Sequence, residues 1–190
     1  MSPGPDGLRV RELRWGDFDD LRETYYRLYE ERDRGDPLGL TLFETRPSLA
    51  DESEWFGGLF RRALAGDAIV SVAEIDRHVV GHCTIGRLAP SAASESAHVG
   101  VLGIVVDERY RGRGVGTALI EDALRRARAK FEVVRLQVFA FNSDARRLYE
   151  RMGFVGCGRI PRVLRRGGAY FDSDEMVLVF GSEPDARAKS

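Results

Sequence analysis

Three glycines at every second position, among arginines, mark the stretch VVDERYRGRGVGTALIEDAL. They follow an apolar, strand-like run and precede a helical pattern. Glycine lets a ligand approach the backbone closely, and the first N–H groups of a helix are unpaired and lie at the positive end of its dipole. With the forked donors of Arg111 and Arg113, this arrangement predicts an anion site suited to phosphate. The glycines are Gly112, Gly114 and Gly116.

Two common phosphate-binding patterns do not fit this spacing. The NTPase loop needs Gly-Lys followed by Ser or Thr, which the sequence lacks, and the dinucleotide fingerprint needs G-x-G-x-x-G where this chain has G-x-G-x-G. A solvated turn with incidental arginines also fits these residues. From this stretch alone, the phosphate site and the solvated turn both stay open.

A second stretch, LQVFAFNSDARRLYERMGF, combines a strand with a short helix. Asn142 stands where a helix N-cap is expected. An apolar stripe at helical spacing follows it, so spacing alone favours a core position for Tyr149. The stripe consists of Ala145, Leu148, Tyr149 and Met152.

Together, the two stretches resemble the GNAT superfamily of N-acetyltransferases. The family's acetyl-CoA motif, Arg/Gln-x-x-Gly-x-Gly/Ala, is matched by Arg111, Gly114 and Gly116, and its lead-in by Val106, Tyr110, Arg111 and Gly112. The family's second signature is matched by Asn142, Ala145, Leu148, Tyr149, Gly153 and Phe154. The motifs cover about Val99–Phe154, and the order of elements extends the resemblance over most of residues 8–180.

The resemblance implies a fold and a reaction. The fold would be α/β (α+β), a central mixed, twisted sheet of about seven strands flanked by about four helices. The reaction would move an acetyl group from acetyl-CoA to a primary amine of a small molecule or amino acid by direct attack. It would need neither a covalent enzyme intermediate nor a metal.

The resemblance also implies which residues hold the coenzyme. The backbone of Ile104, Val105 and Val106 would bind the pantetheine arm in the manner of a strand, between two splayed strands. Asn142 and Ala145 would contact the same arm. The pyrophosphate would lie on the loop made of Arg111, Gly112, Arg113, Gly114, Val115, Gly116 and Thr117.

Two proton transfers accompany the reaction. Tyr149 would protonate the departing thiolate, and a strand N–H would help to stabilise the oxyanion. Many relatives use a central-strand carboxylate as the base, but AHVGVLGIVV contains none. His98 opens that strand, and histidine is a residue type suited to receiving a proton near neutrality, so we predict it as the base. A structural histidine at this position, His82 or Glu74 on neighbouring strands, and a water relay are the alternatives.

The acceptor is less constrained by the sequence, and we expect its site in the N-terminal helices and loop, about residues Tyr25–Trp55, and in the final hairpin, RRGGAYFDSDEMVL. The last hairpin resembles GNAT members that act on small amines and free amino acids, through Gly168, Tyr170, Asp172 and Met176. Acetylation of peptide or protein N-termini and a non-catalytic acyl-CoA-sensing module stay as alternatives. Many such proteins pair through C-terminal strands, so we expect that two copies can form a homodimer.

The remaining elements must position these residues. Alternating residues predict a strand in LRVREL and a hairpin from AIVSVAEI to VVGHCTIG. Helices are predicted from an Asp17 cap to about Glu31, from about Ser48, from the glycine stretch to about Lys130, and after Asn142. Two final strands, about Val155–Leu164 and Tyr170–Phe180, meet at a Gly-Gly turn. One domain over residues 8–180 is expected, between loose tails at 1–7 and 181–190.

Composition narrows the class of protein. The chain has 190 residues, 43% of them hydrophobic, and a formal net charge of -1. Its near-neutral charge argues against nucleic acid as a partner, although arginines near the C-terminus could form a local patch. Two cysteines form no disulfide framework and lack zinc-site spacing. No apolar stretch reaches the length of a membrane span, so a cytoplasmic protein with no membrane partner is expected.

Overall fold

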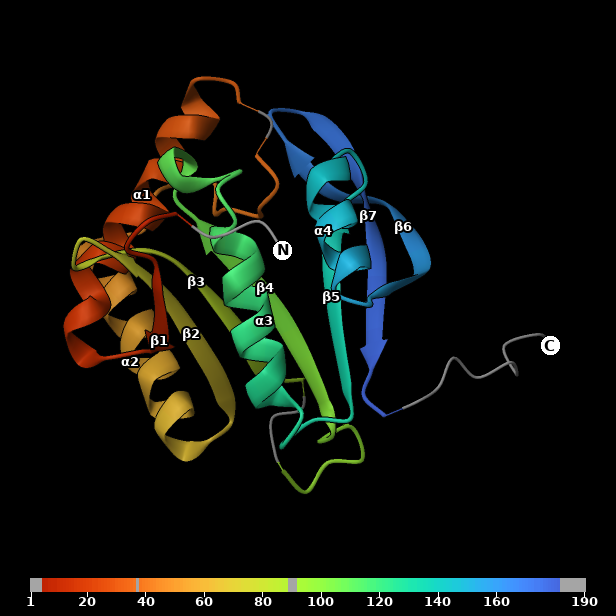
Figure 1. Cartoon of the computed structure of the whole chain (residues 1–190). Helices are drawn as coiled ribbons and strands as arrows, with labels where there is room; N and C mark the ends of the chain where they lie inside the picture. Colours follow the sequence, from red (N-terminus) through yellow and green to blue (C-terminus); the bar gives the residue numbers. More distant parts are fainter. Residues whose placement is uncertain (1–4, 37, 89–91, 182–190) are drawn as a thin grey trace.

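One mixed sheet organises the chain, with strand order β1-β2-β3-β4-β5-β7-β6 (Figure 1). The computed structural model describes residues 5–36, 38–88 and 92–181. Only β4 and β5 pair in parallel, and every other neighbouring pair is antiparallel. The strands are β1 (Arg9–Glu12), β2 (Ala68–Ile75), β3 (His78–Arg87), β4 (Val99–Val106), β5 (Val133–Phe139), β6 (Val155–Arg166) and β7 (Ala169–Val179). The fold predicted from the sequence is confirmed.

Helices cover both faces of this sheet, α3 and α4 on one and α1 and α2 on the other (Figure 1). The β2 strand shows why both faces are needed, because Ile69 and Ala73 pack in the core beneath α3 while Val70 and Val72 pack with α1 and α2. The helices are α1 (Phe18–Asp33), α2 (Leu49–Ala65), α3 (Val115–Ala127) and α4 (Ser143–Arg151), with short 3-10 turns at Trp15–Asp17 and Glu108–Tyr110.

The helix caps agree with the sequence in two cases and differ in one. Ser48 and Asp51 form a capping box on α2, and the Asn142 side chain accepts from the N–H of Ala145 at 3.2 Å. Asp17 precedes α1 as expected, but its carboxylate is bound to Arg11 at 2.8 Å instead of capping the helix. A stronger, charge-assisted partner therefore displaces the cap. The α3 helix ends at Ala127, three residues before the expected end.

The two halves of the sheet meet over a short ladder. Residues Val99–Val101 of β4 pair with Val133–Arg135 of β5, and no further pairs join these two described strands. Beyond that point the strands diverge toward their C-terminal ends (Figure 1). The backbone of the second half of β4 is therefore paired on the β3 side alone.

The chain ends lie largely outside the described part. Residues 5–7 form a turn before β1, and Gly181 follows β7, whereas residues 1–4 and 182–190 of the expected tails lie outside the described residues. Among the helices of the described part, none is both long and apolar enough to cross a membrane.

Candidate active site

The glycine stretch forms the entrance to α3. Gly114 is the N-cap residue with φ +84°, and Gly112 has φ +71°. Both values lie in the left-handed region, which L side chains rarely adopt. No side chain caps the helix, so the first-turn N–H groups of Val115, Gly116 and Thr117 face outward. These donors and the helix dipole fit a bound phosphate.

The two arginines of the stretch have different partners. Arg111 forms an ion pair with the buried Glu31 of α1 at 2.6 Å and donates from Nε to the Val106 carbonyl at 2.9 Å. Its side chain ties α1 to the loop, so its guanidinium is not free for phosphate. Arg113 is exposed, lies over the Tyr110 ring, and has no carboxylate partner among the described residues. Arg113 is therefore the cation that a phosphate can reach.

The strand before this loop presents a free backbone edge. Ile104 and Val106 pack their side chains against the core beneath α3, while their backbones pair with Cys83 and Gly81 of β3. The opposite edge faces the gap between β4 and β5, where the described strands have no ladder. Val105 lies between them and pairs with His82. This edge is accessible to an extended ligand that hydrogen-bonds as a strand does.

Across the gap, α4 directs Tyr149 toward the same place. Its side chain is 7% exposed, packs edge-on against Phe154, and belongs to the core cluster that includes Cys83. Burial, reinforced by the nearby Cys83 thiol, raises the pKa of the Tyr149 phenol. The hydroxyl makes no hydrogen bond to any described residue and is protonated at neutral pH. Ala145 and Asn142 lie one to two turns earlier on the same helix.

The structure argues against His98 as the base. His98 is exposed and precedes the first residue of β4, where its carbonyl accepts from Glu132 and Val133. β4 pairs with β5 at this end, over Val99–Val101, so His98 lies outside the part of β4 that borders the gap. A general base must lie within hydrogen-bonding reach of its proton. Glu74, another alternative, is occupied by Arg11 at 2.7 Å.

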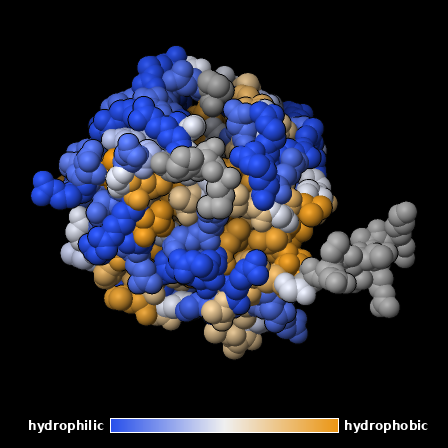
Figure 2. Space-filling view, viewed as in Figure 1, coloured by the Kyte–Doolittle hydropathy of each residue, from blue (hydrophilic) through white to orange (hydrophobic). Residues whose placement is uncertain are grey.

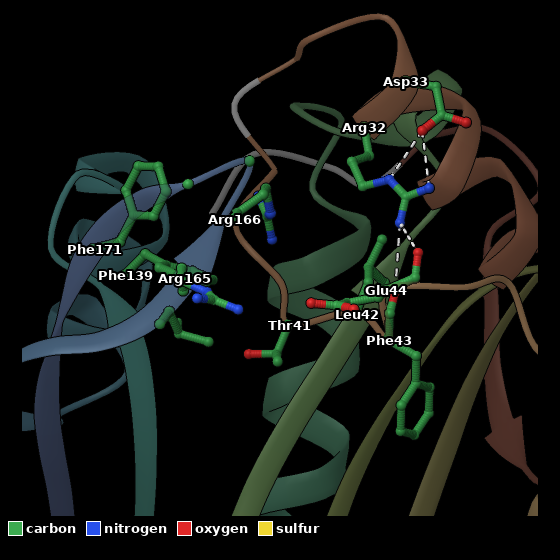
Figure 3. Close-up of a pocket in the computed structure, with 13 residues that line it drawn as sticks. Arg32, Asp33, Thr41, Leu42, Phe43, Glu44, Phe139, Arg165, Arg166 and Phe171 are labelled. Atoms are coloured by element: carbon green, nitrogen blue, oxygen red, sulfur yellow. Dashed lines mark hydrogen bonds and ion pairs between the residues drawn. The ribbon is translucent and has the colours of Figure 1, made fainter.

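A cavity of about 550 Å³ opens beside the C-terminal ends of these strands (Figure 3). One wall is formed by the end of α1 and the loop from Thr41 to Glu44, and the other by Phe139, Phe171 and the turn between β6 and β7. The Arg166 guanidinium donates to the Leu38 carbonyl at 2.8 Å and also to the Leu40 carbonyl. The loop between α1 and α2 is thereby held across the sheet.

The two arginines Arg32 and Arg166 of this cavity are compensated to different degrees. Burial, and then the nearby Arg32, lowers the pKa of Arg166. Among the described residues Arg166 contacts carbonyl oxygens and no carboxylate. Arg32 has an adjacent partner in Asp33 at 2.9 Å and also donates to the Glu44 carbonyl at 3.0 Å. A cavity with cations at one end and phenyl rings along a wall suits a small anion with an apolar part.

Apart from Phe139 and Leu164, the lining residues come from the two segments in which the sequence places the acceptor site, about residues Tyr25–Trp55 and the final hairpin. The hairpin residues singled out in the sequence now have visible contacts. The Asp172 carboxylate accepts from the Arg162 N–H at 2.9 Å, where φ is +52° and the β6 ladder is irregular, and Arg162 lies over Tyr170. Met176 is fully buried. These residues therefore shape the hairpin beside the cavity.

Comparisons with known proteins agree with this geometry. Residues 9–154 match the family described as Acetyltransferase (GNAT) family. The L-amino acid N-acetyltransferase AaaT of Escherichia coli is 34% identical over 110 residues, which is 57% of this chain and 66%, just under two thirds, of that relative.

Solved structures share the fold over most of the chain. A ribosomal-protein-alanine N-acetyltransferase from Brucella melitensis is 26% identical, with a TM-score of 0.77 over 90% of this chain and 99% of that one. The protein yncA from Salmonella typhimurium, solved with its cofactor acetyl-CoA, is 19% identical, with a TM-score of 0.79 over 95% and 99%.

The splayed sheet and the glycine-rich helix entrance define the class as acyltransferase. The matched residues span most of the chain and carry both motifs, so the chain belongs to the GNAT family of N-acetyltransferases.

Proposed function

We propose that this chain transfers the acetyl group of acetyl-CoA to the primary amine of a small acceptor that carries a carboxylate, such as a free amino acid. The observation that carries the acceptor class is the cavity with the under-compensated Arg166 beside phenyl rings. The amino acid activity that AaaT's name states for that relative points the same way.

The coenzyme fits the residues present. The uncapped start of α3 and the exposed Arg113 would hold its pyrophosphate, and the free edge of Ile104–Val106 would pair with the pantetheine arm. Asn142 and Ala145 would flank that arm from α4. Bound acetyl-CoA supplies an acetyl group activated as a thioester. No metal is required for amine attack on a thioester, since the chain supplies hydrogen-bond donors and a proton donor.

The chain's part in the reaction is positioning and proton transfer. The β4 backbone N–H groups would fix the thioester carbonyl and stabilise negative charge on its oxygen. Tyr149 would donate its phenolic proton to the thiolate as the carbon–sulfur bond breaks. Arg166 would orient the acceptor through its carboxylate, so that its amine faces β4.

A panel of matched acceptors tests this function. Thiol release from acetyl-CoA is followed with free L-amino acids, with their carboxamides, and with the corresponding amines that lack the carboxyl group. We expect kcat/KM to be at least 10-fold higher for the free amino acids, because the carboxamide lacks the charge that Arg166 recognises. Equal values for acid and amide would contradict the acceptor class.

Two further measurements distinguish this function from N-terminal acetylation and from a non-catalytic acyl-CoA-sensing module. One set of substrates consists of peptides that begin with alanine, because the Brucella melitensis protein is named a ribosomal-protein-alanine N-acetyltransferase. A preference for these peptides would favour N-terminal acetylation. Acetyl-CoA binding in calorimetry without thiol release from any amine would favour the sensing module. Arg166→Gln should raise KM for amino acids about 10-fold or more and leave acetyl-CoA affinity unchanged. Arg61→Gln on α2, which is exposed and does not line the cavity, is the matched control.

We also propose that two copies pair through the C-terminal strands. Figure 2 shows hydrophobic residues at the surface of the half that carries these strands. In the same strands, Val155 is 66% and Val179 is 44% exposed. Burial of such a patch favours association. Sedimentation of the wild type and of Val155→Asp measures it, and a monomeric wild type would contradict the pairing.

A further inference from the structure

In the proposed reaction the attacking amine must lose a proton, and no base has yet been assigned to take it. The geometry of β4 limits where such a base can lie. Leu102, Ile104 and Val106 face the core under α3. Val101 and Gly103 alternate with them and are exposed on the opposite face. Because α3 and α4 fill the first face, an acceptor amine has access to the gap from the face of Val101 and Gly103.

His82 lies on this accessible face. It pairs with Val105 across the antiparallel β3–β4 ladder, and paired residues point to the same face with Cα atoms about 5 Å apart. Its neighbour Thr84, two residues along, pairs with Gly103 and contacts its carbonyl. The His82 side chain therefore lies next to Val105, on the β3 side of the half of β4 whose other edge is free.

The surroundings of His82 leave its nitrogens available. The side chain is 9% exposed, and its Nδ1 is fully buried without a hydrogen-bond partner in the described residues. The ring of Trp55, from α2, lies 6.1 Å from the imidazole. Since Nδ1 is closed to solvent, Nε2 is the nitrogen that an acceptor can reach. Burial lowers the pKa of the imidazole to about 4, so the ring is neutral at physiological pH.

A histidine kept for structure would be expected to satisfy its nitrogens. Buried polar groups in folded proteins almost always have partners, and an orphaned one costs stability. His78, by comparison, is exposed and lies 3.4 Å from Asp20. The unpaired imidazole of His82 is thus a group that the described fold does not use.

We propose that His82 is the proton acceptor for the attacking amine. The step rests on the proposed function. The acceptor nitrogen bonds to the thioester carbon and the carbon–sulfur bond breaks, with one proton passing from nitrogen to His82 Nε2 and one from Tyr149 to sulfur. As its lone pair bonds to carbon, the nitrogen becomes a stronger acid, so a weakly basic imidazole can take the proton. Solvent then removes the proton from His82 and restores Tyr149.

A second buried titratable group, Glu52, must be distinguished from His82 by experiment. Glu52 of α2 is 4% exposed, lies one turn before Trp55, and has no cation within ion-pairing distance among the described residues. Burial raises the pKa of its carboxyl. Tyr25 lies close to Glu52, and burial raises the pKa of its phenol too, so it holds its proton. Glu52 is the competing base.

Three variants test the proposal. His82→Leu removes the base and fills most of its volume, His82→Ala leaves a space for added imidazole, and Glu52→Gln removes the competitor. We expect His82→Leu to lower kcat about 100-fold or more, in the range of general base catalysis. Its acetyl-CoA affinity and melting temperature should be unchanged or higher, since an orphaned polar group has been removed. Imidazole should restore at least 10-fold of the rate to His82→Ala and nothing to His82→Leu.

The outcomes distinguish the role of His82 from the function itself. A His82→Leu variant with at least a third of wild-type kcat, in an assay limited by acetyl transfer, overturns the proposal. The proposal is also overturned if the rate falls together with the melting temperature and imidazole does not restore it. A 100-fold loss of kcat in Glu52→Gln alone overturns it as well. If the wild type binds acetyl-CoA but acetylates no amine, the proposed function fails and the role of His82 fails with it. Thr84→Val, on the same strand and face, is the matched control.

Discussion

At the residue scale, the Tyr149 hydroxyl has a donor proton and no described partner. Its ring is held by Phe154 and by the core, so the packing does not depend on the hydroxyl. Burial raises the phenol's pKa, which keeps the proton in place until negative charge develops nearby. A group held in this way can donate to a thiolate without first breaking another hydrogen bond.

The change Tyr149→Phe tests this role. Because the ring stays and no described hydrogen bond is lost, we expect the melting temperature and the acetyl-CoA affinity to stay within error. We expect kcat to fall about 100-fold, as for the loss of a general acid. Thermal unfolding, calorimetry and single-turnover kinetics measure the three quantities. A stable variant with wild-type single-turnover rate would exclude Tyr149 as the acid.

His82 should also affect stability as pH changes. Its folded pKa is about 4 and its unfolded value is about 6.5, so between these values the unfolded chain binds a proton that the folded chain does not. Protonation of His82 therefore leaves the free energy of unfolding unaffected above about pH 6.5 and lowers it progressively as pH falls toward 4. The total is roughly 3 kcal/mol.

The free energy of unfolding of wild type and His82→Leu, from urea titrations between pH 7 and pH 4.5, measures this contribution. We expect the wild type to lose more stability than the variant over this range. The comparison isolates His82, because the buried Glu52 carboxyl has a raised pKa and contributes with the opposite sign in both proteins. Parallel curves would mean that His82 does not stay neutral in the fold.

At the element scale, α1 and the coenzyme loop are joined by charge. Glu31 is 2% exposed and pairs with Arg111, while Arg27 of the same helix pairs with Asp107 at 3.1 Å. Removal of one partner leaves the other charge uncompensated in a partly buried place. The helix therefore fixes the position of the loop whose N–H groups would hold the pyrophosphate.

We expect Glu31→Gln to weaken acetyl-CoA binding by about 10-fold and to lower the free energy of unfolding by about 1–3 kcal/mol. The matched control is Glu23→Gln on α1, whose carboxylate is 60% exposed and 3.5 Å from Arg27. Surface pairs of this kind contribute little. Calorimetry and denaturant unfolding give both quantities, and unchanged affinity in Glu31→Gln would show that α1 does not position the loop.

Gly116 offers a second test at this scale. A Cβ there would meet Leu148 at 3.5 Å and Ile104 at 3.8 Å, which are ordinary contacts. Gly116→Ala should therefore fold normally and still obstruct a ligand that passes between α3, β4 and α4. We expect acetyl-CoA affinity to fall about 10-fold with an unchanged melting temperature, and equal affinity would place the coenzyme elsewhere. Gly114, at φ +84°, cannot serve as cleanly, because any side chain there is strained.

The helices and strands were predictable because the contacts that define them are local. Contacts between residues far apart in the sequence were not predictable. Asn142 was identified as a cap because its partner, Ala145, is three residues away. The ion pair of Arg111 was not predicted, because Glu31 is 80 residues distant and nothing in the motif indicates that pairing. Arg166 meets the Leu38 carbonyl across 128 residues. His98 lies at the end of β4 that pairs with β5, and the sequence does not indicate which end of that strand faces the gap.

At the scale of the whole molecule, the sheet is two units joined by a short parallel ladder. The β1–β4 unit carries the glycine loop, and the β5–β7 unit carries α4 and one wall of the cavity. Contacts between the units include the Val99–Val101 ladder and the Arg166 contact to the loop before α2. A ligand held in the gap would touch both units and add contacts where the ladder is absent.

Acetyl-CoA should therefore stabilise the molecule and protect a specific region. At 100 times its Kd, a ligand that binds only the folded state adds about 2.7 kcal/mol. We expect amide hydrogen exchange to slow most at Ile104, at Val106 and at the start of α3, because these N–H groups lie at the free edge and the uncapped helix end. The β2 amides, paired on both sides by β1 and β3, serve as the internal reference. Desulfo-CoA, which keeps the pyrophosphate and lacks the thioester, should protect α3 equally. Uniform protection of the sheet, or none at α3, would mean that the coenzyme does not occupy this gap.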